Sequence, residues 1–337
     1  MNKILLLGGA GFIGQNLAKF LAKDSVNSLT IADNFFRNNG KIDTELKELA
    51  KTYNISIIKG DFTKYNQFKK LKKYYDQIYM LASIVGVDYA NEMPHEIIRV
   101  NTGLIYNTLE WLREFGCGKV VFTSTSECYA GTIEAFNYTI PTPEEVPLTI
   151  KDISHPRFTY AATKILGESG FLSYSNKLGF ECSIIRYHNV YGPKMGFKHV
   201  IPHLAQRFYN EENPFIIYGA NQTRSFNYID DALKGTILTM NKGKNGEIYH
   251  IGSKDEISIE TLVKYTGKLF DYNGEYTYGR EYSGSIFRRC PDITKAENDL
   301  GYRPKTSWKT GVNKTIKWYK NYLSKTNDLF ESFYKKK

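Results

Sequence analysis

The hydrophobic residues of the chain alternate between short continuous runs and longer stretches with helical spacing. The first run, at residues 4–7, is apolar throughout, which is typical of a strand that is buried on both faces. Similar runs predict strands at 28–32, 55–58, 77–81, 119–123 and 182–186, and helical spacing predicts helices at 41–53, 95–115 and 159–178. This alternation of strands and helices predicts an α/β fold with a parallel sheet.

The pattern changes in the second half of the chain. Beyond residue 186 the alternation weakens and the segments shorten, which predicts a smaller, C-terminal lobe laid over the first. A strand at 247–251 is predicted to return to the main sheet, so that the two lobes interleave. We therefore expect one domain at 1–186, a second lobe at 187–330 and a basic tail at 331–337.

Three glycines mark the turn between the first strand and the first helix. A Cβ at Gly8, Gly11 or Gly14 would keep a pyrophosphate away from the backbone N–H groups of the helix start. Asp33 ends the second strand, 19 residues after Gly14, where it can accept hydrogen bonds from ribose hydroxyls. The pattern predicts a Rossmann-type doubly wound sheet and favours NAD. Arg37 leaves NADP open, and a turn that merely packs a helix on a strand is the other alternative.

Small and polar residues follow other strands, at the edge where open α/β sheets bind their ligands. Asp61 could accept a hydrogen bond from the adenine amino group, or it could cap the following helix. Ala82 and Ser83 leave room for a flat nicotinamide ring. Asn101 shares the apolar face of its helix, where its amide either braces backbone near the cofactor or acts as a structural lock.

The composition restricts the compartment and the partners. Among the 337 residues no apolar run approaches the roughly 20 that span a bilayer, and the first run is too short for a signal peptide, which predicts a cytoplasmic protein without a membrane partner. Four scattered cysteines predict reduced thiols. The net charge of +10 is spread along the chain, which disfavours nucleic-acid binding and suits an anionic, phosphate-bearing substrate.

A tyrosine and a lysine four residues apart carry the candidate chemistry. Tyr160 and Lys164 lie one turn apart on the same face of the predicted helix. An adjacent ammonium, aided by a cationic nicotinamide, is expected to lower the pKa of the phenol toward neutrality. The phenolate can then accept a hydroxyl proton while the carbon is oxidised.

The motifs of the chain also occur in a characteristic order. They are Gly8-Gly9-Ala10-Gly11-Phe12-Ile13-Gly14, Asp33-Asn34, Gly60-Asp61, Thr125-Ser126-Glu127-Cys128-Tyr129, residues 160–164, residues 186–193, Thr223-Arg224-Ser225-Phe226 and Arg288-Arg289-Cys290-Pro291-Asp292. Over nearly its whole length the chain resembles the extended short-chain dehydrogenases/reductases of the nucleotide-sugar epimerase/dehydratase family.

This resemblance implies a set of site residues. Tyr160 is implied as the base, Lys164 as its activator and nicotinamide-ribose ligand, and Thr125 as the hydroxyl that holds the sugar oxygen. The residues expected at NAD are Gly8, Gly11, Phe12, Ile13, Gly14, Asp33, Asn34, Asp61, Phe62, Leu81, Ala82, Ser83, Asn101, Tyr160 and Lys164.

The second lobe is implied to bind a nucleotide-diphosphate sugar, GDP- or UDP-linked. Asn189 would bind near the diphosphate, and Arg224 and Arg289 would neutralise it, since a guanidinium matches phosphate geometry. Arg288 could serve in place of Arg289. Ser126 occupies a substrate-side position that is acidic in most dehydratases and serine in the GDP-mannose type.

The resemblance leaves the complete reaction open. The leading hypothesis is NAD-dependent oxidation at C4 of an activated hexose or heptose, completed by epimerisation or by release of the 4-keto sugar, for surface glycan biosynthesis. Glu127 resembles the acid/base glutamate of nucleotide-sugar 4,6-dehydratases and of glucuronic acid decarboxylases, so both reactions are alternatives. A catalytically silent NAD(P)-sensing scaffold is the non-enzymatic alternative.

Two further expectations concern assembly and metals. The resemblance implies a homodimer, or a higher homo-oligomer, through the helices that begin near His95 and Thr159. His199 and His203 have the spacing of a helical metal pair, but Pro202 between them predicts that no helix runs on through this segment, so we expect no metal site.

Overall fold

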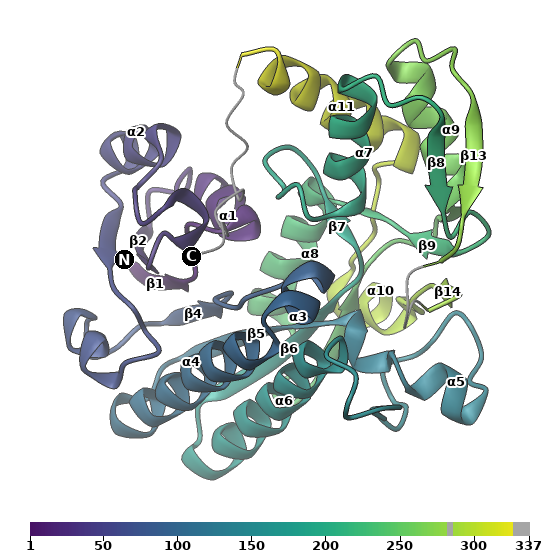
Figure 1. Ribbon diagram of the computed structural model, residues 1–337. Coiled ribbons are helices and arrows are strands. Elements are labelled where there is room, and N and C mark those ends of the chain that lie inside the picture. Colours follow the sequence, from purple (N-terminus) through teal and green to yellow (C-terminus); the bar gives the residue numbers. More distant parts are fainter. Residues whose placement is uncertain (282–285, 326–337) are drawn as a thin grey trace.

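Seven parallel strands form the main sheet of the computed structural model, which describes residues 1–281 and 286–325. Their order is β11-β6-β5-β4-β1-β2-β3 (Figure 1). The strands are β1 (Asn2–Leu7), β2 (Asn27–Asp33), β3 (Ser56–Lys59), β4 (Gln77–Met80), β5 (Lys119–Thr125), β6 (Glu181–Tyr187) and β11 (Ile248–Ile251). The predicted Rossmann-type α/β sheet is confirmed, and the strand predicted at 247–251 does pair with β6.

Helices cover both faces of this sheet. On β1, Ile4 and Leu6 pack against α1 and α8, whereas Leu5 and Leu7 point to the opposite face, which α4 and α6 cover. Because neither face of the strand meets water, its run is apolar at every position. The covering helices are α1 (Phe12–Leu21), α2 (Thr44–Tyr53), α4 (Pro94–Phe115), α6 (Phe158–Leu178) and α8 (Ile229–Lys242).

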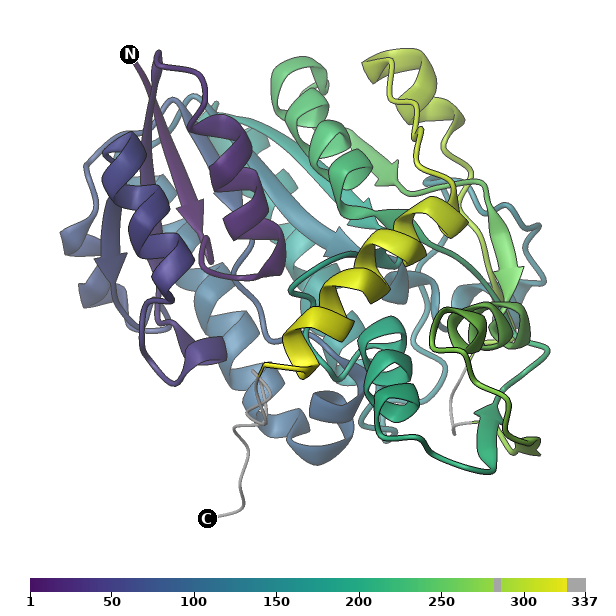
Figure 2. The ribbon, with the colours of Figure 1, turned by 90° about the horizontal axis from the view of Figure 1, so that it is seen from above.

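A smaller lobe lies beside the carboxyl ends of the main strands, where its strands form three small sheets (Figure 2). Its elements are β7 (Val190–Tyr191), α7 (Val200–Tyr209), β8 (Phe215–Tyr218), β9 (Thr223–Ser225), β10 (Asn227–Tyr228), β12 (Glu256–Ser258), α9 (Ile259–Leu269), β13 (Tyr276–Gly279), β14 (Arg288–Arg289), α10 (Thr294–Leu300) and α11 (Trp308–Leu323). Short helices in the connections are η1 (Phe36–Asn38), η2 (Tyr65–Lys70), α3 (Val87–Glu92), η3 (Ser126–Tyr129) and α5 (Thr132–Phe136). The basic tail predicted at 331–337 lies outside the described residues.

Two predictions about helices need correction, the start of α2 and the effect of Pro202. Helix α2 begins at Thr44 and not at residue 41, because the Asp43 carboxylate accepts a hydrogen bond from the Leu46 N–H at 2.8 Å and caps the helix there. The prediction that Pro202 prevents a helix is wrong. Pro202 lies in the first turn of α7, where a backbone N–H has no intrahelical partner, so the ring is tolerated. Within the described residues, no group of three or more His, Cys, Asp or Glu side chains could hold a metal ion.

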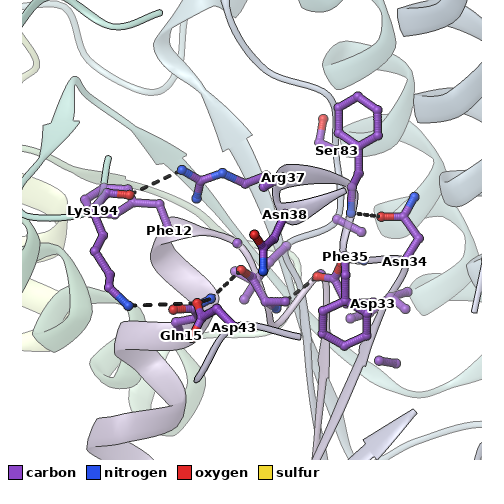
Figure 3. Close-up of a pocket in the computed structure, with 18 of the residues that line it drawn as sticks. Phe12, Gln15, Asp33, Asn34, Phe35, Arg37, Asn38, Asp43, Ser83 and Lys194 are labelled. Carbon is purple, nitrogen blue, oxygen red and sulfur yellow. Dashed lines mark hydrogen bonds and ion pairs between the residues drawn. The ribbon is translucent and has the colours of Figure 1, made fainter. Parts of the chain in front are cut away.

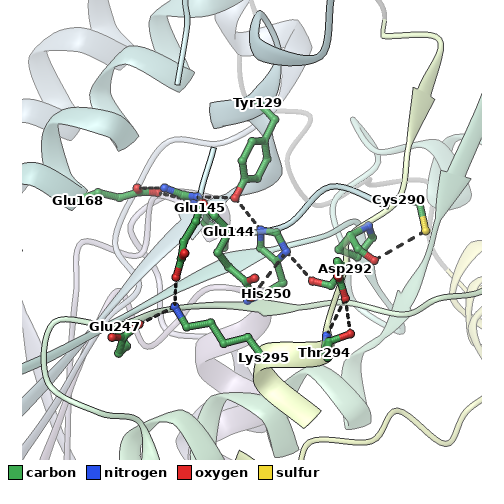
Figure 4. Close-up of polar contacts among 12 residues, drawn as sticks. Tyr129, Glu144, Glu145, Glu168, Glu247, His250, Cys290, Asp292, Thr294 and Lys295 are labelled. Atoms are coloured by element: carbon green, nitrogen blue, oxygen red, sulfur yellow. Dashed lines mark hydrogen bonds and ion pairs between the residues drawn. The ribbon is translucent and has the colours of Figure 1, made fainter. Parts of the chain in front are cut away.

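A buried polar network ties β6 to its neighbours. Arg186 and Glu168 form a two-pronged ion pair, Nε to Oε1 at 2.9 Å and Nη2 to Oε2 at 2.6 Å, and both side chains are almost fully buried. Arg186 also donates to the Tyr129 hydroxyl, which lies 2.6 Å from His250 Nε2 on β11 (Figure 4). His250 Nδ1 is 2.8 Å from the Asp292 carbonyl oxygen. The network thus joins α6, β6, η3, β11 and the segment after β14.

None of the helices in the described ranges is long and apolar enough to cross a bilayer.

Candidate active site

In the turn between β1 and α1, neighbouring backbone atoms leave no room for a Cβ at two of the three predicted glycines. Gly8 has a φ of +85°, and a Cβ there would lie 2.4 Å from the Ala82 nitrogen. A Cβ on Gly14 would lie 2.6 Å from the Gly9 Cα. At Gly11 the atom nearest to a Cβ would be the Gly8 oxygen at 3.3 Å, so the fold excludes a side chain less strictly here than at Gly8 or Gly14. Gly11 is the N-cap of α1, where unpaired N–H groups favour an anion.

A cavity of about 470 Å³ opens beside this turn (Figure 3). Gly8, Gly11 and Asp33 line it together with Ala82 and Ser83. The Asp33 carboxylate accepts hydrogen bonds from the N–H groups of Ala10 at 2.9 Å and Phe35 at 2.7 Å, while burial raises its pKa. An open glycine at a helix start, with an acid at the end of β2, fits the pyrophosphate and the adenosine ribose of a dinucleotide.

Most of the residues predicted at the cofactor line this cavity or the adjoining one, and two do not. Asp61 accepts hydrogen bonds from the Thr63 N–H at 3.2 Å and the Thr63 hydroxyl at 2.7 Å. It does not cap the following helix, whose N-cap is Lys64, and its adenine contact stays a prediction. The Asn101 amide donates to the Ile84 carbonyl oxygen at 3.2 Å and accepts from the Ile84 N–H at 2.8 Å. Asn101 therefore braces the backbone of a residue that lines both cavities.

We expect Gly11→Ala to weaken NAD binding by at least about 10-fold, because the new methyl group occupies the approach of the pyrophosphate. In the protein without cofactor the melting temperature should fall only slightly, since the added Cβ lies 3.3 Å from the Gly8 carbonyl oxygen, which has to move by a few tenths of an ångström. Calorimetric titration with NAD and thermal melts measure the two effects. Gly103→Ala, whose Cβ would be in ordinary contact with Thr63, is the matched control and should leave the affinity for NAD unchanged. Unaltered NAD affinity in Gly11→Ala would contradict the assignment of this turn.

A second cavity, of about 460 Å³, adjoins the first and shares Gly8, Gly11 and Ser83 with it. Strand β5 ends there at Thr125, and helix α6 places Tyr160 and Lys164 on the same wall. The lining residues that were predicted from the sequence include Ile13, Gly14, Ser126, Glu127, Asn189 and Arg289. The dinucleotide cradle thus opens directly onto the tyrosine–lysine pair.

Without a bound nicotinamide the pKa of Tyr160 is raised and not lowered, so its activation by Lys164 together with the cofactor stays a prediction. Burial raises the pKa of Tyr160, and the hydrogen bond from Thr125 opposes this only in part. The Lys164 ammonium donates to the Thr123 carbonyl oxygen at 2.8 Å, and burial lowers its pKa to about 8. Desolvation therefore dominates the pKa of Tyr160, and the Lys164 ammonium lies 5.9 Å from the centre of its ring. A phenolate here needs the further positive charge of a bound nicotinamide.

Glu127 lies between two arginines. Its Oε1 accepts a hydrogen bond from Arg289 Nη1 at 2.7 Å, and its Oε2 is 3.6 Å from Arg157 Nη2. Although burial acts to raise it, the charges of Arg289 and Arg157 lower the pKa of Glu127 to about 2. Arg157 is a further residue of the site that was not predicted from the sequence. Its position three residues before Tyr160, at the end of an irregular proline-rich segment, was the available signal.

The ion pairs of Glu127 predict how the stability of the fold depends on pH. Because its pKa is lower in the folded protein than in the unfolded chain, Glu127 stabilises the fold fully above about pH 4.5, and this contribution disappears as the pH falls toward 2. Glu127→Gln should therefore melt well below the wild type at pH 7, and the gap should close on acidification. Thermal melts between pH 7 and 3 measure it. A gap that stays constant with pH would contradict a paired carboxylate.

The remaining substrate-side predictions divide into two groups. Ser126 and Asn189 line the cavity. The Ser126 hydroxyl accepts from Arg289 Nη1 at 3.3 Å, and the Asn189 amide donates to the Ser225 carbonyl oxygen at 2.8 Å. Among the described residues that line this cavity, Arg224 is absent. Its guanidinium donates hydrogen bonds to the carbonyl oxygens of Thr223 and Phe287. Arg288 pairs with Glu256 at 2.8 Å, so of these two neighbouring arginines it is Arg289 that lines the cavity.

The cradle for a dinucleotide opens onto a tyrosine and a lysine on α6, beside the end of β5. This arrangement defines a short-chain dehydrogenase/reductase, and the second lobe places the chain among the extended members. The narrower assignment follows from comparison with family models. Residues 4–252 match the NAD dependent epimerase/dehydratase family. The chain belongs to this family, it is an enzyme, and NAD is its cofactor.

Individual relatives match over almost their whole length. The chain is 33% identical to a UDP-N-acetyl-alpha-D-glucosaminuronate decarboxylase of Bacillus cytotoxicus, with 94% of this chain and 98% of the relative covered. It is 31% identical to a UDP-glucuronate 4-epimerase of Thermodesulfobacterium geofontis, with coverage of 96% and 98%. A solved variant of the UDP-glucuronic acid 4-epimerase of Bacillus cereus, in complex with UDP-4-deoxy-4-fluoro-glucuronic acid and NAD, superimposes with a TM-score of 0.82 at 25% identity, covering 95% and 99%.

Proposed function

We propose that the protein uses NAD to oxidise C4 of a nucleotide-diphosphate hexose or heptose, GDP- or UDP-linked, in the assembly of surface glycans. The 4-keto sugar is then either reduced from its other face, which gives the C4 epimer, or released. One observation carries the proposal: Thr125, Tyr160 and Lys164 line a cavity that is continuous with the dinucleotide cradle. A sugar held there has its hydroxyl beside a proton acceptor and its carbon beside the nicotinamide end of the cleft.

The protein's own part in oxidation is to move one proton. Tyr160 accepts it from the C4 hydroxyl, and Thr125 holds the sugar oxygen while it is transferred. Lys164 keeps a positive charge behind the phenol, with its ammonium anchored to the Thr123 carbonyl oxygen. Bound NAD supplies the acceptor for the hydrogen and electron pair that leave C4.

The charge state of Glu127 supports epimerisation or release over dehydration. Elimination of water from a 4-keto sugar needs a base for the C5 proton and an acid for the leaving group. With a pKa of about 2, Glu127 is a weak base, and its protonated form is scarce near neutral pH. We therefore propose that Glu127 fixes Arg289 and Arg157 in place. Its predicted acid/base role remains a prediction.

Decarboxylation is the second candidate, and the two arginines favour it. Arg157 and Arg289 line the cavity close to Tyr160, so a sugar that carries a carboxylate at C6 would meet a positive wall. A uronic acid oxidised at C4 is a β-keto acid, which loses carbon dioxide without a protein base. This is also the activity named for the Bacillus cytotoxicus relative.

Mass spectrometry of product mixtures tests the proposal. The purified protein is incubated with UDP-, GDP- and dTDP-linked hexoses, heptoses and uronic acids. Unchanged mass with inverted C4, or the loss of two hydrogens, supports C4 oxidation with epimerisation or release. Loss of carbon dioxide supports the second candidate, and loss of water would overturn the argument from Glu127. No turnover of any sugar would contradict the enzyme proposed here.

We also propose a homodimer through α4 and α6, which pack side by side (Figure 1). Ile98, Tyr106 and Leu166 on these helices are 47%, 61% and 52% exposed, so the two helices carry apolar side chains that a second copy of the chain could cover. Light scattering of the purified protein should give twice the mass of the chain, and the mass of one chain would contradict the proposal.

A further inference from the structure

Polar side chains from the two lobes meet at the rim of the dinucleotide cavity (Figure 3). Lys194, in the loop after β7, pairs with Glu45 of α2, and its Nζ lies 3.8 Å from Asp43 Oδ2. Arg37 Nη2 donates to the Lys194 carbonyl oxygen at 3.2 Å. All four residues line the cavity. We call Arg37, Asp43, Glu45 and Lys194 the cross-lobe bridge.

The cross-lobe bridge is joined to the phosphate cradle. Asp43 Oδ2 accepts a hydrogen bond from Gln15 Nε2 at 2.8 Å, and the same Nε2 donates to the Ala10 carbonyl oxygen at 2.9 Å. Ala10 lies within the glycine turn, and its N–H donates to Asp33. A bound dinucleotide and an intact bridge therefore constrain the same segment of backbone, and each stabilises the other.

Aromatic side chains of the second lobe extend the wall that Lys194 begins. Trp318 and Tyr322, on α11, line the same cavity as Gly8 and Asp33. The cradle comes from the first lobe, whereas this outer wall comes from residues more than 150 positions further along the chain. Both lobes therefore contribute to the lining of this cavity, and the cross-lobe bridge joins them there.

The ion pairs of the bridge are of intermediate strength. The side chains of Lys194, Asp43 and Glu45 are 31%, 29% and 41% exposed, so water and salt screen them in part. Pairs of this kind open and close readily, and several acting together slow the separation of two surfaces more than one does.

We propose that the cross-lobe bridge retains NAD in its cavity and that opening of the bridge limits the exchange of bound for free dinucleotide. NAD is then a resident group of the enzyme. Lys194, Glu45, Asp43 and Arg37 are retention residues that act on the cofactor whichever sugar is the substrate, so the inference does not depend on the proposed function.

The exchange rate of NAD tests this inference without any sugar. The protein is loaded with radiolabelled NAD, mixed with excess unlabelled NAD, and the label that stays bound is followed in time. Lys194→Gln should lose the label about 2- to 5-fold faster than the wild type, as expected when partly exposed ion pairs are removed. Lys244→Gln, which removes the exposed pair with Asp299 far from the cavity, is the matched control and should exchange like the wild type.

Two further measurements separate retention from a general loss of structure. Added salt should speed release from the wild type and have little effect on Lys194→Gln, because the screened pairs are already absent there. Lys194→Arg, which keeps a positive charge opposite Glu45 and Asp43, should release NAD nearly as slowly as the wild type. Release from Lys194→Gln at the wild-type rate, or release from Lys194→Arg as fast as from Lys194→Gln, would overturn the proposal.

Discussion

Tyr160→Phe is expected to reduce turnover by about 10³-fold while NAD remains bound, because the variant loses only the oxygen that we propose accepts the C4 hydroxyl proton. The ring still fills its place in the wall of the second cavity, so cofactor affinity and fold should be preserved. Steady-state assays with the sugar found by the mass screen give the turnover, and calorimetric titration gives the affinity for NAD.

The structure provides a control for this experiment within the same cavity. Tyr187 also lines it, but its hydroxyl is bonded to the Thr236 hydroxyl at 2.6 Å and not directed to the reaction. Tyr187→Phe should therefore keep most of the activity. A fully active Tyr160→Phe variant would refute the assigned base.

Glu168→Gln is expected to lower the free energy of unfolding by about 3–5 kcal/mol, because it leaves the buried Arg186 guanidinium without a compensating charge. The pair joins α6, which carries Tyr160, to β6, and the same guanidinium supports Tyr129 (Figure 4). Urea unfolding followed by circular dichroism measures the loss.

Replacing both partners of the ion pair distinguishes a buried charge from simple loss of packing. The double change Glu168→Leu with Arg186→Met leaves no unpaired charge, so it should cost less than the sum of the two single changes. Additive losses, or a cost below about 1 kcal/mol for Glu168→Gln, would show that the pair contributes little beyond its volume.

Much of the main sheet follows from local pattern, which is why the sequence predicts it. The run at 4–7 is apolar at every position because both faces of β1 are covered, and Gly8 and Gly14 are glycines because backbone lies within 3 Å of any Cβ. The spacing of Tyr160 and Lys164 is set by one helical turn. Each of these signals lies within a few residues of the feature that it predicts.

The properties that the sequence does not predict depend on distant parts of the chain. Glu127 and Arg289 are 162 residues apart, and Arg157 approaches them through a loop without regular spacing. Lys194 meets Asp43 only because the second lobe folds back over the first. The raised pKa of Tyr160 comes from desolvation, which is a property of the assembled cavity and not of the helix that carries the lysine.

The most direct test of C4 oxidation follows an isotope at that carbon. The protein is mixed with a nucleotide sugar carrying deuterium at C4, the reaction is quenched at short times, and the cofactor is analysed by mass spectrometry. We predict that deuterium enters the cofactor in the wild type and that Tyr160→Phe lacks this transfer. If deuterium stays on C4 at all times, for every UDP-, GDP- and dTDP-sugar offered, the protein does not oxidise that carbon and the account is contradicted.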